Sequence, residues 1–268
     1  MKTNVKLYFL STIILTLLLS GLRTACFLTS FEQDVGYFSS TPLTVVTTVL
    51  YALSILWCLA ALLLFPKNAT LASTDGIGRA VIGKLTGSLF LFSGLCILIG
   101  RLAKSFPVVG GTSALLPILG IFAVLSSFFF FTDGVRTEKL GTAHATFGFA
   151  VLVFLFAFLF FTYFNMYVAI NSPIKNSLQL SILSTLFFLL SEIRESIGGS
   201  RPRLSAVLGP LCAFFCVPTA VSHLILERSS LCNTPTKALI SPFFSLTLLA
   251  IGIFALSRFP TEKKTDMQ

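Results

Sequence analysis

Long apolar runs, separated by short polar segments, recur along the whole chain. A helix rising about 1.5 Å per residue needs about 20 residues to cross the roughly 30 Å hydrocarbon core of a bilayer. Buried helices and strands of water-soluble folds are usually shorter and do not recur in this way. The pattern predicts an all-α, polytopic transmembrane helix bundle with short loops, in a single integral membrane domain of residues 1–268. The eight expected spans are residues 7–28, 43–65, 81–102, 115–132, 146–167, 177–193, 204–226 and 239–256.

The composition agrees with a chain that is buried in lipid. Hydrophobic residues make up 55% of the 268 residues and charged residues 11%, and the mean hydropathy is +0.92. A soluble domain carries about 25% charged residues. Nearly all the charges lie in the short connections between the apolar runs, which leave no room for a separate soluble domain.

Lys and Arg residues divide unequally between the two sides of this eight-helix arrangement. Multi-pass proteins concentrate these residues in their cytoplasmic loops, which also accounts for the net charge of +9 without nucleic acid. Thirteen lie on the side of both termini and six on the other, so we expect a cell-membrane protein with both termini in the cytoplasm. The thirteen are Lys2, Lys6, Lys67, Arg79, Lys84, Arg136, Lys139, Arg194, Arg201, Arg203, Arg258, Lys263 and Lys264; the six are Arg23, Arg101, Lys104, Lys175, Arg228 and Lys237.

The first apolar run has two interpretations. Lys2 and Lys6 before an apolar stretch also describe a secretory signal peptide, and Leu22–Cys26 is similar to a lipoprotein processing site. Arg23 stands where that site has an apolar residue, which favours an uncleaved first helix. Cleavage would leave seven helices in the same orientation.

The densest group of charges closes the sixth run. Glu192, Arg194 and Glu195 lie at its end, and Arg201 and Arg203 follow a glycine-containing turn. Charged residues at the edge of a membrane span often mark function, and arginines bind the phosphates of anionic lipid head groups or an acidic protein partner. The alternative is a helix end that reaches the interface, followed by arginines that only fix the topology.

A weaker candidate site lies in the seventh run. His223 and Glu227 are four residues apart, so they share a helix face on which they can form a hydrogen bond. Pro210 and Pro218 can kink this helix and free backbone carbonyls, as in transporters that build a site there. The alternative is an interfacial histidine without a ligand.

Motifs for catalysis and cofactor binding are missing. The chain has no His-Glu-x-x-His sequence and no phosphate-binding Gly-x-x-x-x-Gly-Lys-Ser/Thr loop. His144 and His223 are too few for a histidine-rich metal or haem site, and Cys212 and Cys216 lack further soft ligands nearby in sequence. We therefore predict no catalytic residue, no cofactor and no metal.

Small residues recur on the third and fifth runs, at Gly87, Gly94, Gly141, Ala145 and Gly148. Membrane helices use such residues where two backbones approach closely. We expect helix contacts at these positions.

The segment Asn171–Pro173 with Lys175, and the turn Gly198–Leu204, resemble a group of uncharacterised bacterial multi-pass membrane proteins. The resemblance covers about residues 160–205. It implies a bacterial cytoplasmic membrane and transfers no activity.

Three classes of function remain open on this sequence. The first, which the sequence favours over the other two, is a non-enzymatic, sensor-like or accessory subunit, with a packed bundle that binds lipid or a partner near Arg201 and Arg203. The second is a small-molecule transporter, which needs a polar site where broken helices meet. The third is a membrane enzyme, which needs a base within reach of a nucleophile or carboxylate.

Overall fold

The computed structural model describes residues 2–32, 36–64, 77–103, 114–133, 141–166, 168–197, 202–229, 237 and 239–258. Within these ranges the chain forms eight α-helices and one short antiparallel β-hairpin, in which Phe31 pairs with Phe38. The all-α prediction is confirmed. In chain order the elements are α1 (Lys2–Ser30), β1 (Phe31–Glu32), β2 (Tyr37–Phe38), α2 (Pro42–Leu64), α3 (Ile77–Leu102), α4 (Leu115–Asp133), α5 (Gly141–Tyr163), α6 (Pro173–Ser196), α7 (Pro202–Arg228) and α9 (Pro242–Ser257).

Within the described ranges, the seven helices α1 to α7 are long and apolar enough to cross a membrane. The eighth expected span is present as a shorter helix. α9 has 16 residues, or about 24 Å at about 1.5 Å per residue. It begins only at Pro242 because proline disfavours helical backbone in the residue before it, and Ser241 has the extended ψ of 137°.

α6 begins four residues before its expected span, because its first turn is capped. The Ser172 hydroxyl accepts a hydrogen bond from the backbone N–H of Lys175 at 3.2 Å. Pro173 follows at the first helical position, where its missing N–H has no cost. The cap places Lys175 in the first turn of a membrane-spanning helix.

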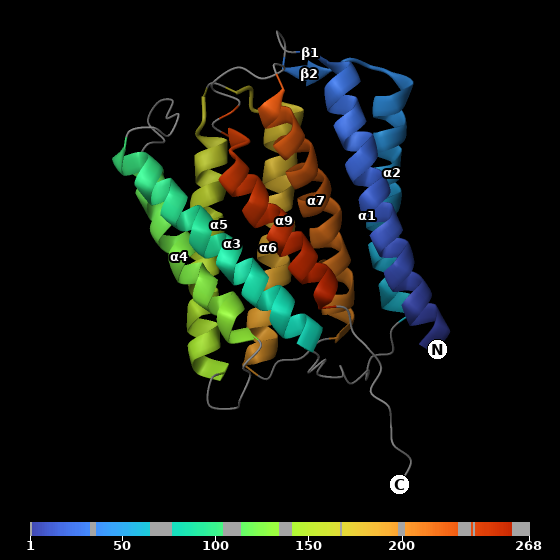
Figure 1. The fold of residues 1–268 in the computed structure, drawn as a ribbon. Coiled ribbons are helices and arrows are strands. Elements are labelled where there is room, and N and C mark those ends of the chain that lie inside the picture. Colours follow the sequence, from blue (N-terminus) through green and yellow to red (C-terminus); the bar gives the residue numbers. More distant parts are fainter. Residues whose placement is uncertain are drawn as a thin grey trace.

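Figure 1 shows α1 and α2 side by side at one edge of the bundle and α4 at the opposite edge, with α3 running obliquely from that edge across the front of the bundle. α1 and α2 pack on the remaining helices through α7, whereas α3 packs against α4 and α9. α1 begins and α9 ends at the same end of the bundle, which we call the terminal end. The β-hairpin lies at the opposite end, which we call the hairpin end.

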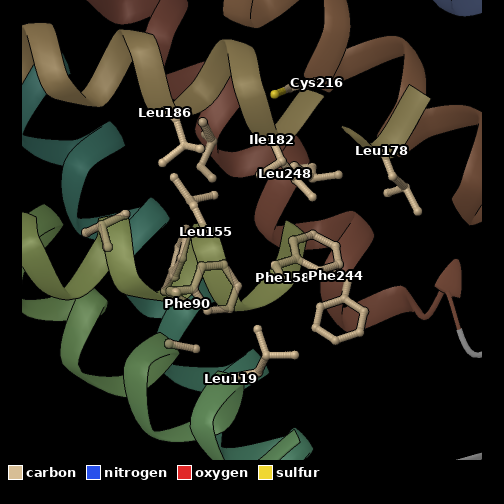
Figure 2. Packing of buried hydrophobic residues seen from close by; sticks show 14 of the residues in the cluster. Phe90, Leu119, Leu155, Phe158, Leu178, Ile182, Leu186, Cys216, Phe244 and Leu248 are labelled. Carbon is tan, nitrogen blue, oxygen red and sulfur yellow. The ribbon is translucent and has the colours of Figure 1, made fainter. Parts of the chain in front are cut away.

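Phenylalanine rings fill the centre of the bundle between α3, α4, α5 and α9. The ring centroids of Phe90 and Phe130 are 4.9 Å apart, and Phe158 stacks on Phe244 at 4.4 Å. Figure 2 shows Phe158 and Phe244 next to each other within the buried cluster. Lipid tails are as apolar as these side chains, so tight packing of this kind, and not the hydrophobic effect, is what favours contact between helices.

Glycines allow the closest helix contacts, as the sequence predicts. A Cβ added at Gly94 of α3 would lie 2.9 Å from the carbonyl oxygen of Gly120 in α4. One at Gly87 would lie 2.9 Å from Ser127 O, and one at Gly148 would lie 2.5 Å from a side-chain carbon of Ile193. The expectation of close packing is confirmed at Gly87, Gly94 and Gly148.

We expect Gly94→Ala to lower the free energy of unfolding by about 1–3 kcal/mol, the usual cost of forcing extra atoms into a packed core. The new Cβ would meet backbone atoms of Gly120 and Val124, which cannot rotate away. Gly21→Ala in α1 is the matched control, since its Cβ would have no atom within 4 Å and gains only helix propensity. Unfolding in detergent–SDS mixed micelles measures both. Equal losses in the two variants would contradict the close approach of α3 and α4.

Candidate functional site

Three charged side chains from three helices meet inside the terminal end. Arg258, the residue after α9, forms ion pairs with Asp133 at the end of α4 and with Glu192 in the last turns of α6. The Arg258 Nε and Glu192 Oε2 atoms are 3.0 Å apart, and all three side chains are buried. We call these residues the terminal cluster. Because burying an ion in lipid or protein is costly, each charge requires the others to be in place.

Aromatic and hydroxyl groups extend the terminal cluster. The Arg258 guanidinium lies 4.5 Å from the centre of the Phe254 ring, close enough for a cation–π contact. Thr132, the neighbour of Asp133, forms a hydrogen bond with Nδ1 of His144 at 2.9 Å. The buried His144 ring stacks on Phe129 at 4.3 Å. α4, α5, α6 and α9 are therefore joined by polar contacts at this end.

The structure divides the charge group predicted at the end of α6. Glu192 is buried in the terminal cluster, whereas Arg194 is exposed and Glu195 and Arg203 are half-buried. Arg201 lies outside the described residues. The four described residues do not form one surface patch, because Glu192 is turned into the bundle and Arg194 is turned away from it.

Sequence reasoning missed two of the three residues in the terminal cluster. Asp133 directly follows the fourth expected span, and Arg258 lies two residues after the eighth. Both spans were expected to end on the side where the sixth span ends. The sequence signal for an ion pair with Glu192 was therefore the placement of Asp133 and Arg258 at span ends on the same side of the membrane.

We expect Arg258→Gln to lower the free energy of unfolding by about 3–5 kcal/mol, because it leaves two buried carboxylates without their cation. Adding Asp133→Asn and Glu192→Gln should restore much of that loss, since neutral side chains need no counter-charge. Arg194→Gln is the control, and as an exposed substitution it should change stability by less than about 0.5 kcal/mol. Unfolding in mixed micelles measures each variant. A triple variant less stable than Arg258→Gln would contradict this account.

A buried polar seam joins α6 to α7 in the middle of the bundle. The Ser181 hydroxyl lies 2.9 Å from the carbonyl oxygen of Phe215 and 3.1 Å from the Thr219 hydroxyl. One turn along, the Thr185 hydroxyl lies 3.1 Å from Sγ of Cys216 and 3.5 Å from Sγ of Cys212. We call Ser181, Thr185, Cys212, Cys216 and Thr219 the seam.

The seam faces the part of α7 that contains its two prolines. Pro218 has no N–H to donate to the carbonyl of Phe214, and Pro210, eight residues earlier, likewise removes one backbone hydrogen bond of the helix. The Ser181 hydroxyl contacts the next carbonyl, that of Phe215. α6 thus supplies polar contacts where the α7 backbone is weakened, which is how membrane proteins tolerate proline within a span.

Polar residues follow α6 through most of the membrane. Ser177, the seam, Ser191 and Glu192 are all buried on this helix or against it. Ser191 and Ser205 of α7 approach each other at 3.2 Å. From Ser177 to Glu192 the helix rises about 22 Å at about 1.5 Å per residue, and the apolar residues Leu186–Leu190 interrupt the polar groups. The α6–α7 contact therefore carries hydroxyl, thiol and carboxyl groups in two stretches, one from Ser177 to Thr185 and one at the terminal end.

Two cations lie at the hairpin end. Nη2 of Arg23 in α1 donates a hydrogen bond to the carbonyl of Pro173 at 3.0 Å. The fully buried Lys175 donates from Nζ to the carbonyls of Asn165 and Val168, at 2.7 and 3.3 Å. Lys175 therefore fixes the loop between α5 and α6, and Arg23 connects α1 to the start of α6.

His223 lies close to these cations. Its ring is fully buried against Phe27 of α1, with ring centroids 6.1 Å apart. Neither ring nitrogen has a hydrogen-bond partner, so the predicted contact with the half-buried Glu227 is not formed. The spacing of four residues allowed that contact, but His223 turns towards α1. Its neighbour Arg23 was interpreted from the sequence as a topology signal and as evidence against cleavage, and not as part of a site.

Within the described part of the chain, no group of three or more His, Cys, Asp or Glu residues is arranged to hold a metal ion. No family model, curated protein or solved structure matches the chain. The apolar helices and the charges buried between them define the class of the molecule, a multi-pass helical membrane protein.

Proposed function

We propose that this protein is a small-molecule transporter, in which α6 and α7 separate to open a path along the seam. The observation that supports this best is the buried polar stripe of α6, with charged groups at both of its ends. Of the classes that the sequence left open, a transporter is the one that needs such a stripe. Ionisable and polar side chains within membrane spans are costly, and they commonly mark the path of a solute.

The geometry of α7 favours movement at the seam. Transporters commonly bind their substrates where interrupted helices expose backbone carbonyls. α7 is continuous from Pro202 to Arg228, but Pro210 and Pro218 inside it have no N–H to donate, so two backbone carbonyls lose their helical partner, and the seam faces this part of the helix. In this proposal the terminal cluster closes the path at one end, since its ion pairs tie α6 to α4 and α9.

The Thr132–His144 contact gives little support to an enzyme. The Thr132 hydroxyl lies 2.8 Å from the carbonyl oxygen of Phe128, to which it donates. With its single proton used in this way, the hydroxyl oxygen is left to accept a hydrogen bond from His144 Nδ1, 2.9 Å away. A nucleophile requires the opposite arrangement, in which the imidazole takes the hydroxyl proton.

A lipid-binding or accessory role is the second candidate, and the exposure of Arg194 favours it. This arginine lies at the end of α6, where it can meet anionic head groups or an acidic partner. In that role the seam would serve only to pack α6 against α7. The two candidates therefore differ in whether the seam ever meets water.

The accessibility of Cys216 tests the transporter. In a variant that keeps Cys216 as its sole cysteine, we expect a charged, membrane-impermeant maleimide to label the thiol in sealed vesicles. Adding Arg258→Gln should speed labelling by about tenfold or more, since a shift of about 1.4 kcal/mol towards an open form is sufficient. The reason is that the terminal cluster no longer ties α6 to its neighbours.

Cys58 provides the matched control, because it is equally buried but lies in α2, away from the seam. A variant with Cys58 as its sole cysteine should stay unlabelled with or without Arg258→Gln. If Cys216 is protected in every background, or if Cys58 reacts as fast as Cys216, the transporter proposal fails.

We further propose that the terminal end faces the cytoplasm of a bacterial cell, as the distribution of Lys and Arg favours. A reporter active only in the cytoplasm should be active when fused after Gln268 and inactive when inserted in the β-hairpin at Gly36. The insertion site is suitable because Gly36 lies in a turn with φ +73°. Activity at Gly36 and none after Gln268 would reverse the orientation.

A further inference from the structure

The hairpin end carries two cations, the buried Lys175 and the half-buried Arg23, without a matching negative charge among the described residues. Neither Arg23 nor Lys175 is paired with any carboxylate that the structure describes. Arg23 lies seven residues before the end of α1, or about 10 Å from it at about 1.5 Å per residue. A cation at that depth is costly unless an anion accompanies it.

Lys175 and Arg23 differ in how their donors are used. The two carbonyls that accept from Lys175 Nζ belong to the loop that this lysine fixes. Arg23 uses Nη2 for the carbonyl of Pro173, but its buried Nε has no hydrogen-bond partner. The unused donor of the guanidinium is therefore inside the protein, where water does not reach it.

His223 adds a second unused group at the same place. Its two ring nitrogens are buried and unpartnered, which is uncommon because an unmade buried hydrogen bond destabilises the fold. Arg23 and His223 both lie against Phe27, the guanidinium carbon at 5.1 Å and the imidazole at 6.1 Å from the ring centre. An arginine of α1 and a histidine of α7, each with an unpartnered buried nitrogen, thus lie against one aromatic residue.

We propose that Arg23 and His223 form a binding site for an oxyanion, a carboxylate or phosphate group. A guanidinium presents its N–H groups in a plane that matches the oxygens of such a group, and a neutral imidazole supplies one further N–H. The anion would supply both the missing charge beside Arg23 and the missing acceptor for His223.

Aromatic rings around Arg23 suit an anion with an apolar body. Arg23 also lies 5.9 Å from the centre of the Tyr51 ring in α2, and Tyr51 stacks on Phe215 of α7 at 5.8 Å. The β-hairpin covers Phe27, because Phe38 packs against it with ring centroids 4.8 Å apart. An organic acid or a lipid head group would therefore have its charge at Arg23 and apolar contacts beside it.

This inference deepens the proposed function, since it names the class of solute that a transporter would take from the hairpin end. The binding itself does not require transport. Anion binding can therefore be confirmed even if labelling shows that Cys216 is never accessible. Conversely, anion binding can be absent even if Cys216 is labelled.

Binding is measured on the purified full-length protein with benzoate and inorganic phosphate as soluble probes. Titration calorimetry is run in nanodiscs of phosphatidylcholine, and thermal unfolding is compared with that in nanodiscs that also contain phosphatidylglycerol. Saturable binding of either probe identifies a soluble anion. Stabilisation by phosphatidylglycerol alone identifies a lipid head group.

Arg23→Gln should weaken either interaction by about tenfold or more, because it removes a charge-assisted hydrogen bond. Arg228→Gln is the matched control: it removes the same charge from the same end, at an exposed position of α7, and should leave binding unchanged. If both variants lose binding equally, only diffuse surface charge attracts the anion and the site does not exist.

His223→Leu separates binding from folding. Without a ligand, replacing an unpartnered buried imidazole by an apolar side chain should leave the unfolding temperature unchanged or raise it. Binding should nevertheless weaken by about fivefold or more. The proposal is overturned if His223→Leu binds as tightly as the unmodified protein. It is also overturned if benzoate, phosphate and phosphatidylglycerol all have no effect on the unmodified protein.

Discussion

Arg258 lies between two buried carboxylates, and the positions of α4, α6 and α9 at the terminal end depend on this contact. In lipid the helices gain little from apolar contact alone, so polar contacts and close packing decide which neighbours they keep. Partial separation of an ion pair of this kind is costly, because each charge loses its partner before water reaches it. Either Asp133, Glu192 and Arg258 stay together inside the protein, or the helix ends part far enough for water to reach each charge. Separating the helix ends at the terminal end would therefore leave three charges without their partners at once.

α6 connects two ends of opposite electrostatic character. Its last turns bring Glu192 to the terminal cluster, and its first turn brings Lys175 to the hairpin end. The positive end of the α6 dipole lies beside Lys175 and adds to the charge of Arg23 there. Between these ends, hydroxyl and thiol groups face the weakened backbone of α7. A solute with one negative charge would therefore meet attraction at one end and a closed ion pair at the other.

The apolar pattern predicted the number, class and approximate limits of the helices, because a membrane span requires a continuous apolar stretch of fixed length. It did not predict that α9 would be short, since the local effect of Pro242 is small beside the apolar run. Glu192 was found as a candidate, but its partner Arg258 and the second carboxylate Asp133 are themselves 125 residues apart. No spacing rule connects such positions; only the packing of helices does. At His223 the i, i+4 rule favoured a partner on its own helix, whereas the ring contacts α1.

The attachment of α1 and α2 through α7 has a mechanical consequence. A bend of α7 at Pro218 would swing the α1–α2 pair as a lever, with Arg23 carried on it and Pro173 left behind on α6. This bend would stretch the hydrogen bond between Arg23 and Pro173, which is the polar contact that the structure describes between the α1–α2 pair and α6. In such a bend the molecule would divide into a small body of two helices and a larger one held by the phenylalanine core.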